Sequence, residues 1–95
     1  MVERRVTIGW ADGLHARPAS ILVRAATATG VPVTIARGEG RPVNAASLLA
    51  VLSLGAEPGD EVVLASTGEG EAAANALDRL ARLIAEGLEE PPESA

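Results

Sequence analysis

Residues 31–44 have the sequence VPVTIARGEGRPVN, in which two short runs with alternating apolar residues flank Gly38-Glu39-Gly40. This pattern is typical of two strands joined by a tight turn, because glycine adopts the backbone conformations that hairpin turns require. Pro32 and Pro42 lack the N–H that a strand ladder needs, so we expect both at strand starts or on an edge strand. The segment therefore predicts an antiparallel hairpin, with a strand near 31–35 and a return strand near 41–44.

The residues before the hairpin predict one strand and one helix. Residues 2–10 alternate between apolar and polar side chains, which is typical of a half-buried strand, and Asp12-Gly13 ends that run. Residues 16–29 carry apolar side chains at helical spacing. Pro18 fits only the first turn of that helix, and Gly30 is placed to end it.

The residues after the hairpin predict a helix, a strand and a second helix. Residues 47–54 form the first helix, with Ser47 as its N-cap and Gly55 as its terminator. Residues 61–66 form the strand, and residues 71–87 show a strong helical period. The order β-α-β-β-α-β-α, with strands linked by a hairpin, predicts an α+β two-layer sandwich whose antiparallel sheet is covered on one face.

Composition excludes several classes of function. The chain of 95 residues is the size of one domain; it has no cysteine and one histidine, and all eight basic residues are arginine. These counts exclude disulfides, thiolate or lysine chemistry and a P-loop lysine, and we expect neither a metal site nor a cofactor. One tryptophan, no Phe or Tyr, and a net charge of −5 argue against nucleic acid and anionic membranes as partners.

The charge is divided unevenly along the chain. Residues 1–46 carry six arginines and three acidic residues, a net charge of +3, whereas residues 47–95 carry two arginines and ten acidic residues, a net charge of −8. A site for an anion is therefore expected in the first half, which also holds the histidine. Without an apolar span or a secretory leader, the sequence is expected to be cytoplasmic and not inserted in a membrane.

The segment GLHARPAS, residues 13–20, lies where the first strand gives way to the first helix. With Pro18 in the first turn, His15 falls at or next to the N-cap, where histidine is not a favoured residue. The free N–H groups of Ala16 and Arg17 and the helix dipole would make this helix start an anion site. The same field disfavours imidazolium, so a neutral His15 could attack phosphorus while Arg17 binds the phosphoryl oxygens. The alternative is a solvated loop histidine beside an arginine.

Two motifs resemble the histidine-containing phosphocarrier (HPr) family of the bacterial phosphoenolpyruvate:sugar phosphotransferase system. GLHARPA at residues 13–19 resembles the family's active-site signature, and VNAASLLAVLSLG at residues 43–55 is similar to its regulatory-serine segment. The resemblance covers about residues 2–88 and implies an open-faced β-sandwich, with a four-stranded antiparallel sheet and three helices. We therefore expect a phosphocarrier domain over residues 1–88 and an acidic, proline-containing tail over 89–95 that frays.

The resemblance implies a phosphoryl carrier and not a free-standing enzyme. His15 would accept a phosphoryl group on Nδ1 from phosphorylated enzyme I and pass it to sugar-specific IIA domains, while Arg17 and the Ala16 amide stabilise it. Brief contacts of this kind suit a monomer with a small docking surface. The residues at matching partner-binding positions are Ser20, Arg24, Leu48, Leu49 and Leu52.

Two of these interpretations leave alternatives open. The leucines of residues 48–54 are too many for one buried stripe, so we expect Val51 and Leu54 in the core and Leu48, Leu49 and Leu52 divided between core and docking patch. Ser47 matches a serine that a dedicated kinase phosphorylates in some members, creating a transcriptional co-repressor. Ala46 stands where those members commonly carry lysine, which leaves a plain N-cap as the alternative.

Rival functions remain at this stage. A regulatory binding module would dock through the leucines without carrying phosphate, and a carrier could serve a nitrogen-related or multiphosphoryl relay in place of sugar uptake. A hydrolase with His15 as general base has only Asp12 nearby as a second acid–base group. Trp10 either packs near the site or ends the first strand.

Overall fold

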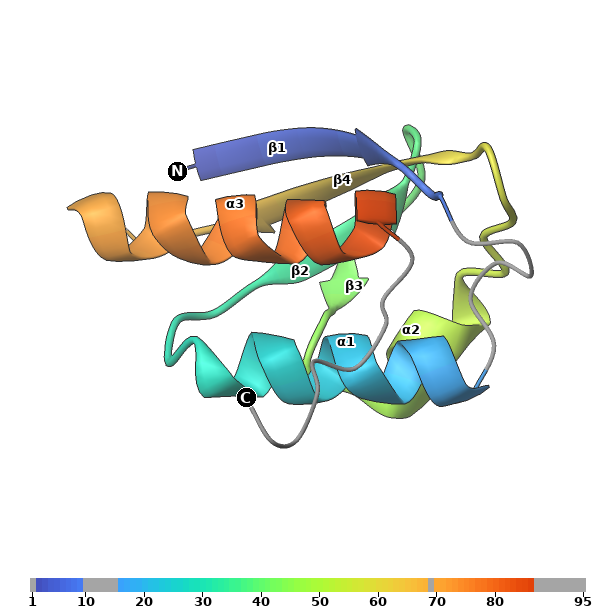
Figure 1. Cartoon of the computed structure of the whole chain (residues 1–95), viewed down its shortest axis with the longest axis horizontal. Helices are drawn as coiled ribbons and strands as arrows, with labels where there is room; N and C mark the ends of the chain where they lie inside the picture. The colour runs from blue at the N-terminus through green and yellow to red at the C-terminus, as the bar shows by residue number, and fades with distance from the viewer. Residues whose placement is uncertain (1, 10–15, 69, 87–95) are drawn as a thin grey trace.

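The computed structural model describes residues 2–9, 16–68 and 70–86, without the side chains of residues 16–18. Four strands form one sheet, and three helices lie on one face of it (Figure 1). This confirms the predicted α+β open-faced sandwich and its element order. The elements are β1 (Val2–Thr7), α1 (Ala16–Ala28), β2 (Thr34–Arg37), β3 (Val43–Asn44), α2 (Leu48–Ser53), β4 (Glu61–Ser66) and α3 (Gly70–Glu86).

The strands are antiparallel in the order β1-β4-β2-β3. β4 lies between β1 and β2, with Arg5 of β1 and Ala36 of β2 both opposite Val63. The predicted hairpin pairs β2 with β3, where Ile35 lies opposite Val43. Because β1 and β4 are far apart in sequence, their pairing joins the N-terminal part of the chain to its C-terminal part within one sheet.

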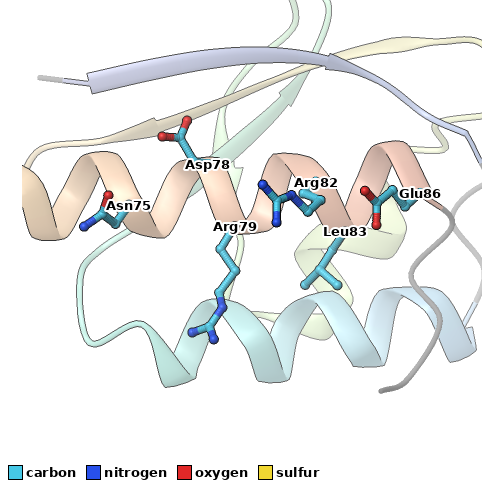
Figure 2. Close-up of a pocket in the computed structure, with 6 residues that line it drawn as sticks. All are labelled: Asn75, Asp78, Arg79, Arg82, Leu83 and Glu86. Atoms are coloured by element: carbon cyan, nitrogen blue, oxygen red, sulfur yellow. The ribbon is translucent and has the colours of Figure 1, made fainter. Parts of the chain in front are cut away.

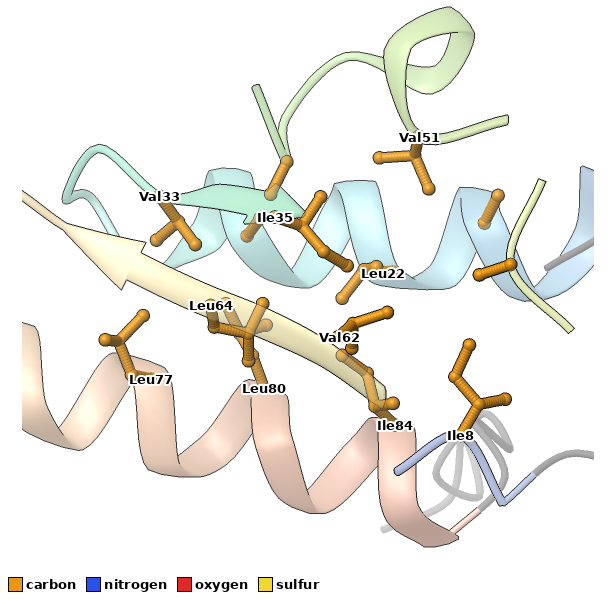
Figure 3. Packing of buried hydrophobic residues seen from close by; sticks show 14 residues of the cluster. Ile8, Leu22, Val33, Ile35, Val51, Val62, Leu64, Leu77, Leu80 and Ile84 are labelled. Carbon is orange, nitrogen blue, oxygen red and sulfur yellow. The ribbon is translucent and has the colours of Figure 1, made fainter. Parts of the chain in front are cut away.

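The core lies between the sheet and the helices (Figure 3). Ile35 and Leu64 are fully buried on the helix-facing side of the sheet, and Leu77, Leu80 and Ile84 are fully buried on the facing stripe of α3. Each such side chain contributes roughly 1.5–3 kcal/mol when it leaves water. The apolar residues that recur at helical spacing in residues 71–87 therefore form the face that α3 buries.

Glycines end the two shorter helices as predicted. Gly30, after α1, has a φ of 75°, and Gly55, after α2, has a φ of 63°. Side chains other than glycine rarely adopt this conformation, so these residues stop the helices at low cost.

Strand β4 has the predicted range of 61–66, whereas the bounds of the other three strands differ from the sequence pattern. β1 was expected to run over 2–10 but ends at Thr7, because the N–H of Ile8 donates to the Asp60 carbonyl at 2.9 Å and Ile8 accepts from Gly59 at 3.0 Å. A turn therefore takes the place of a strand partner there. β2 begins at Thr34, past Pro32, and β3 begins directly after Pro42, since neither proline can donate to a ladder. Trp10 lies outside the described residues.

Candidate functional site

The helix start that was predicted to follow His15 is present. α1 begins at Ala16 and has no acidic residue in its first turn. The first N–H groups of a helix have no intrahelical acceptor, so this end of α1 attracts anions. His15 and the side chain of Arg17 lie outside the described residues.

The rest of α1 shows which of its residues face the solvent. Ala19, Leu22 and Ala26 are buried, whereas Ser20 is half-buried and Arg24 is exposed. Ser20 and Arg24 are four residues apart and therefore share one face of the helix. α1 contains arginine but no acidic residue along its whole length.

α2 divides its leucines between the core and the surface. Val51 is fully buried, which confirms its predicted place in the core, while Leu48 is 39% exposed and Leu49 is 81% exposed. Leu52 and Leu54 are both half-buried against the core. Leu54 was expected in the core; it packs against the core but is only half-buried, because it is the C-cap residue of a short helix.

Ser47 caps α2. Its side chain accepts a hydrogen bond from the Ala50 N–H at 3.4 Å, and its φ of −112° and ψ of 117° are extended, as at an N-cap. The capping interpretation of Ser47 is therefore confirmed, and its role in regulation stays a prediction.

α1 and α2 pack against each other, and Figure 1 shows α2 beside the N-terminal half of α1. The exposed leucines thus lie on the element that neighbours the start of α1. We refer to Ser20, Arg24, Leu48, Leu49 and Leu52 as the α1–α2 surface. It combines three leucines with Ser20 and one basic residue, Arg24.

Gly9, which precedes the segment leading to His15, is a residue that the sequence pattern did not single out. Its N–H donates to the Ile84 carbonyl at 3.2 Å, at the C-terminal end of α3. A Cβ at Gly9 would lie 2.1 Å from the Ala85 carbonyl oxygen. Gly9 therefore fixes the chain against α3 just before the segment that leads to His15. The sequence signal was a glycine within a run of strand residues, which often marks a close backbone approach.

The described residues hold no cluster of three or more His, Asp or Glu side chains that could bind a metal ion. Among the helices that the structure describes, none has the length and apolar character needed to cross a bilayer.

Comparison with known proteins identifies the family. Residues 2–86 match the family model described as the phosphotransferase-system (PTS) HPr component phosphorylation site. The chain belongs to the HPr family. Its relatives include the phosphocarrier protein HPr of Streptomyces coelicolor, 72% identical over 94 residues and covering 99% of both chains. Another is the HPr-like protein Crh of Bacillus subtilis, 36% identical over 86 residues, which covers 90% of this chain and 98% of Crh.

The fold agrees with this family. The crystal structure of a phosphocarrier protein HPr from Bacillus anthracis superposes with a TM-score of 0.78 at 32% identity, covering 87% of this chain and 95% of that one. HPr proteins are carriers within the phosphotransferase system, where they act with other phosphotransfer proteins, and are not free-standing catalysts. The α1–α2 surface can therefore be considered as a surface for such proteins.

Proposed function

We propose that this HPr-family chain accepts a phosphoryl group on His15 from phosphorylated enzyme I and passes it to sugar-specific IIA domains. The observation that supports this most directly is that α1 begins at Ala16, the residue after His15. A phosphoryl group on His15 would then be next to the positive end of a 13-residue helix.

The chemistry needs few groups. In the neutral imidazole, the Nδ1 lone pair attacks phosphorus, and a nitrogen–phosphorus bond forms as the bond to the donor breaks. The donor keeps the electron pair of the broken bond, and the same exchange in reverse delivers the group to the acceptor. The Ala16 amide and the Arg17 guanidinium are proposed to offset the added negative charge, and the helix field contributes about 0.3–1 kcal/mol.

The α1–α2 surface supports a role in docking. An apolar centre beside the basic residue Arg24 suits partners that present apolar and acidic side chains. Leu49 is 81% exposed, so packing against the core does not account for an apolar side chain at this position. The basic half of the chain contains this surface in part, whereas most acidic residues lie beyond it in the sequence. We further propose that the protein works as a cytoplasmic monomer with brief partner contacts.

Phosphoryl acceptance is tested with the wild-type chain, phosphoenolpyruvate and enzyme I, followed by phosphorus NMR. We expect one phosphoramidate resonance that is stable in alkali and lost in acid, and that is absent when enzyme I is omitted. A wild-type chain that stays unlabelled under conditions in which enzyme I itself is phosphorylated would contradict the proposal.

Leu49→Asp tests the docking role. We expect the KM for this chain as a substrate of enzyme I to rise about tenfold, equivalent to about 1.4 kcal/mol, because a charge replaces an apolar contact. The melting temperature should change little, since Leu49 is exposed. Ala72→Asp, at an exposed position of α3, adds the same charge and serves as the control. Equal KM values for the two variants would show that Leu49 does not contact enzyme I.

A further inference from the structure

Strand β1 lies at one end of the sheet, where β4 is its only neighbour among the described strands. In an antiparallel pair, the N–H and C=O groups of successive residues point alternately toward the neighbouring strand and away from it. Ile8 bonds to the turn before β4, donating to Asp60 and accepting from Gly59, so the even-numbered residues of this run point toward that side.

The odd-numbered residues of β1 direct their backbone groups away from β4. Glu61 of β4 lies opposite Thr7, but its carbonyl accepts from the Gly38 N–H on its other side at 2.8 Å. Thr7, Arg5 and Glu3 therefore present N–H and C=O groups at the edge of the sheet. Such an edge is a template on which another chain can add a strand.

The side chain of Arg4 covers part of this edge. Its Nη1 donates to the Glu3 carbonyl oxygen at 2.8 Å, and its Nε donates to Oδ1 of Asp78 in α3 at 2.7 Å. Figure 2 shows Asp78 pointing from α3 toward β1. The guanidinium thus connects α3 to one of the backbone acceptors that an added strand would need.

The sequence of β1 is complementary to itself when two copies run antiparallel. If Glu3 lies opposite Arg5 of a second copy, opposite charges meet twice, and Val2 lies opposite Val6. Opposite charges that face each other across strands contribute roughly 0.2–1 kcal/mol per pair. Glu3 and Arg5 are both exposed in the monomer, so their side chains do not obstruct this pairing.

Arg4 is the residue that this register does not accommodate. It lies on the twofold axis, opposite Arg4 of the second copy, and like charges directly opposite each other are destabilising. The register also requires the Arg5 N–H of one copy to donate to the Glu3 carbonyl of the other, because the two residues face each other at the edge. That carbonyl is the acceptor that the Arg4 guanidinium covers.

We propose that Arg4, held by Asp78, keeps the β1 edge closed to a second copy of this chain. Charged side chains on an edge strand are a common protection against pairing with other chains. Here the guanidinium acts in two ways, since it covers the Glu3 carbonyl and places like charges at the centre of the complementary register. This role does not depend on phosphoryl transfer.

Arg4→Val tests the proposal, because valine suits a strand and removes both the charge and the donor. Sedimentation equilibrium of the full chain measures self-association. We expect the dissociation constant of the dimer to fall at least about tenfold relative to the wild type. Arg4→Thr removes the same groups with less apolar surface and should act in the same direction. Isotope-filtered NOE spectra of the dimer should show contacts between Glu3 of one copy and Arg5 of the other.

Arg41→Val is the matched control, since it makes the same replacement at an exposed position before β3 and should not promote dimerisation. Adding Glu3→Arg to Arg4→Val places like charges opposite each other and should restore the monomer. The proposal is overturned if Arg4→Val self-associates no more than Arg41→Val, or if Glu3→Arg leaves its dimer intact. A wild-type chain that already dimerises through β1, or intermolecular contacts only between β1 and β4, would also overturn it.

Discussion

Replacing His15 with alanine is expected to abolish phosphoryl acceptance, reducing the phosphoramidate resonance to background. The reason is that His15 is the only histidine, and the chain has no cysteine or lysine to serve as another nucleophile for phosphorus. The N–H groups at the start of α1 would remain, but without the imidazole lone pair no nitrogen–phosphorus bond can form. Phosphorus NMR after incubation with phosphoenolpyruvate and enzyme I measures the loss.

The fold should survive this substitution. Histidine is not a favoured N-cap residue, so alanine beside α1 should cost less than about 1 kcal/mol. Circular dichroism and the melting temperature check this. Ser47→Ala is a useful companion, because it removes the cap of α2 and should keep phosphoryl acceptance.

His15→Ala also separates the carrier from its main rival. A carrier loses sugar uptake when His15 is replaced, whereas a module that only docks through Leu48, Leu49 and Leu52 keeps both partner binding and phenotype. Titration calorimetry with a partner domain, together with an uptake assay, distinguishes the two. Normal uptake with the alanine variant would refute the carrier function.

Among the described glycines, Gly9 is expected to be the one whose replacement by alanine destabilises the fold most. The new Cβ would lie 2.1 Å from the Ala85 carbonyl oxygen and 3.0 Å from its carbon, so one backbone must move. Overpacking of this kind costs about 1–3 kcal/mol, and loss of the Gly9 to Ile84 hydrogen bond adds about 1 kcal/mol. In a domain of this size, we expect the melting temperature to fall by roughly 10–25 °C.

Gly30→Ala is the control for glycine itself. Gly30 has a φ of 75°, and a Cβ there would meet no atom within 4 Å. Its replacement should therefore cost only the conformational penalty, about 1 kcal/mol. If Gly9→Ala melts no lower than Gly30→Ala, the close approach to α3 does not constrain the protein. Thermal melts followed by circular dichroism give both values.

Local sequence signals predicted the elements because each signal acts within a few residues. Glycine ends the helices at Gly30 and Gly55, and Ser47 caps α2, since these positions need only their own backbone conformation or one nearby N–H. Strand lengths were predicted less well. Alternation continues through Ile8, yet Ile8 pairs with the turn at Gly59 and Asp60, which are 51 and 52 residues further along the chain and cannot be predicted from a local pattern.

At the candidate site, too, local features could be predicted from the sequence, whereas the orientation of one helix against another could not. The start of α1 after His15 followed from Pro18, and the excess of leucine in residues 48–54 indicated that some side chains lie at the surface. Which leucines are exposed depended on the orientation of α2 against α1, which buries Val51 and leaves Leu49 exposed. Helical spacing alone could not predict that orientation, because a two-turn helix with five apolar residues has several similar faces to bury.

By itself, the sequence determined the order of helices and strands, the presence of a single histidine and the helix start beside it, since these depend on residue identity and short-range spacing. Only the tertiary structure decided that β4 lies between β1 and β2 and that Gly9 contacts the end of α3. These features arise from contacts between segments distant in the chain. Burial of one shared core selects such contacts, and no local pattern encodes them.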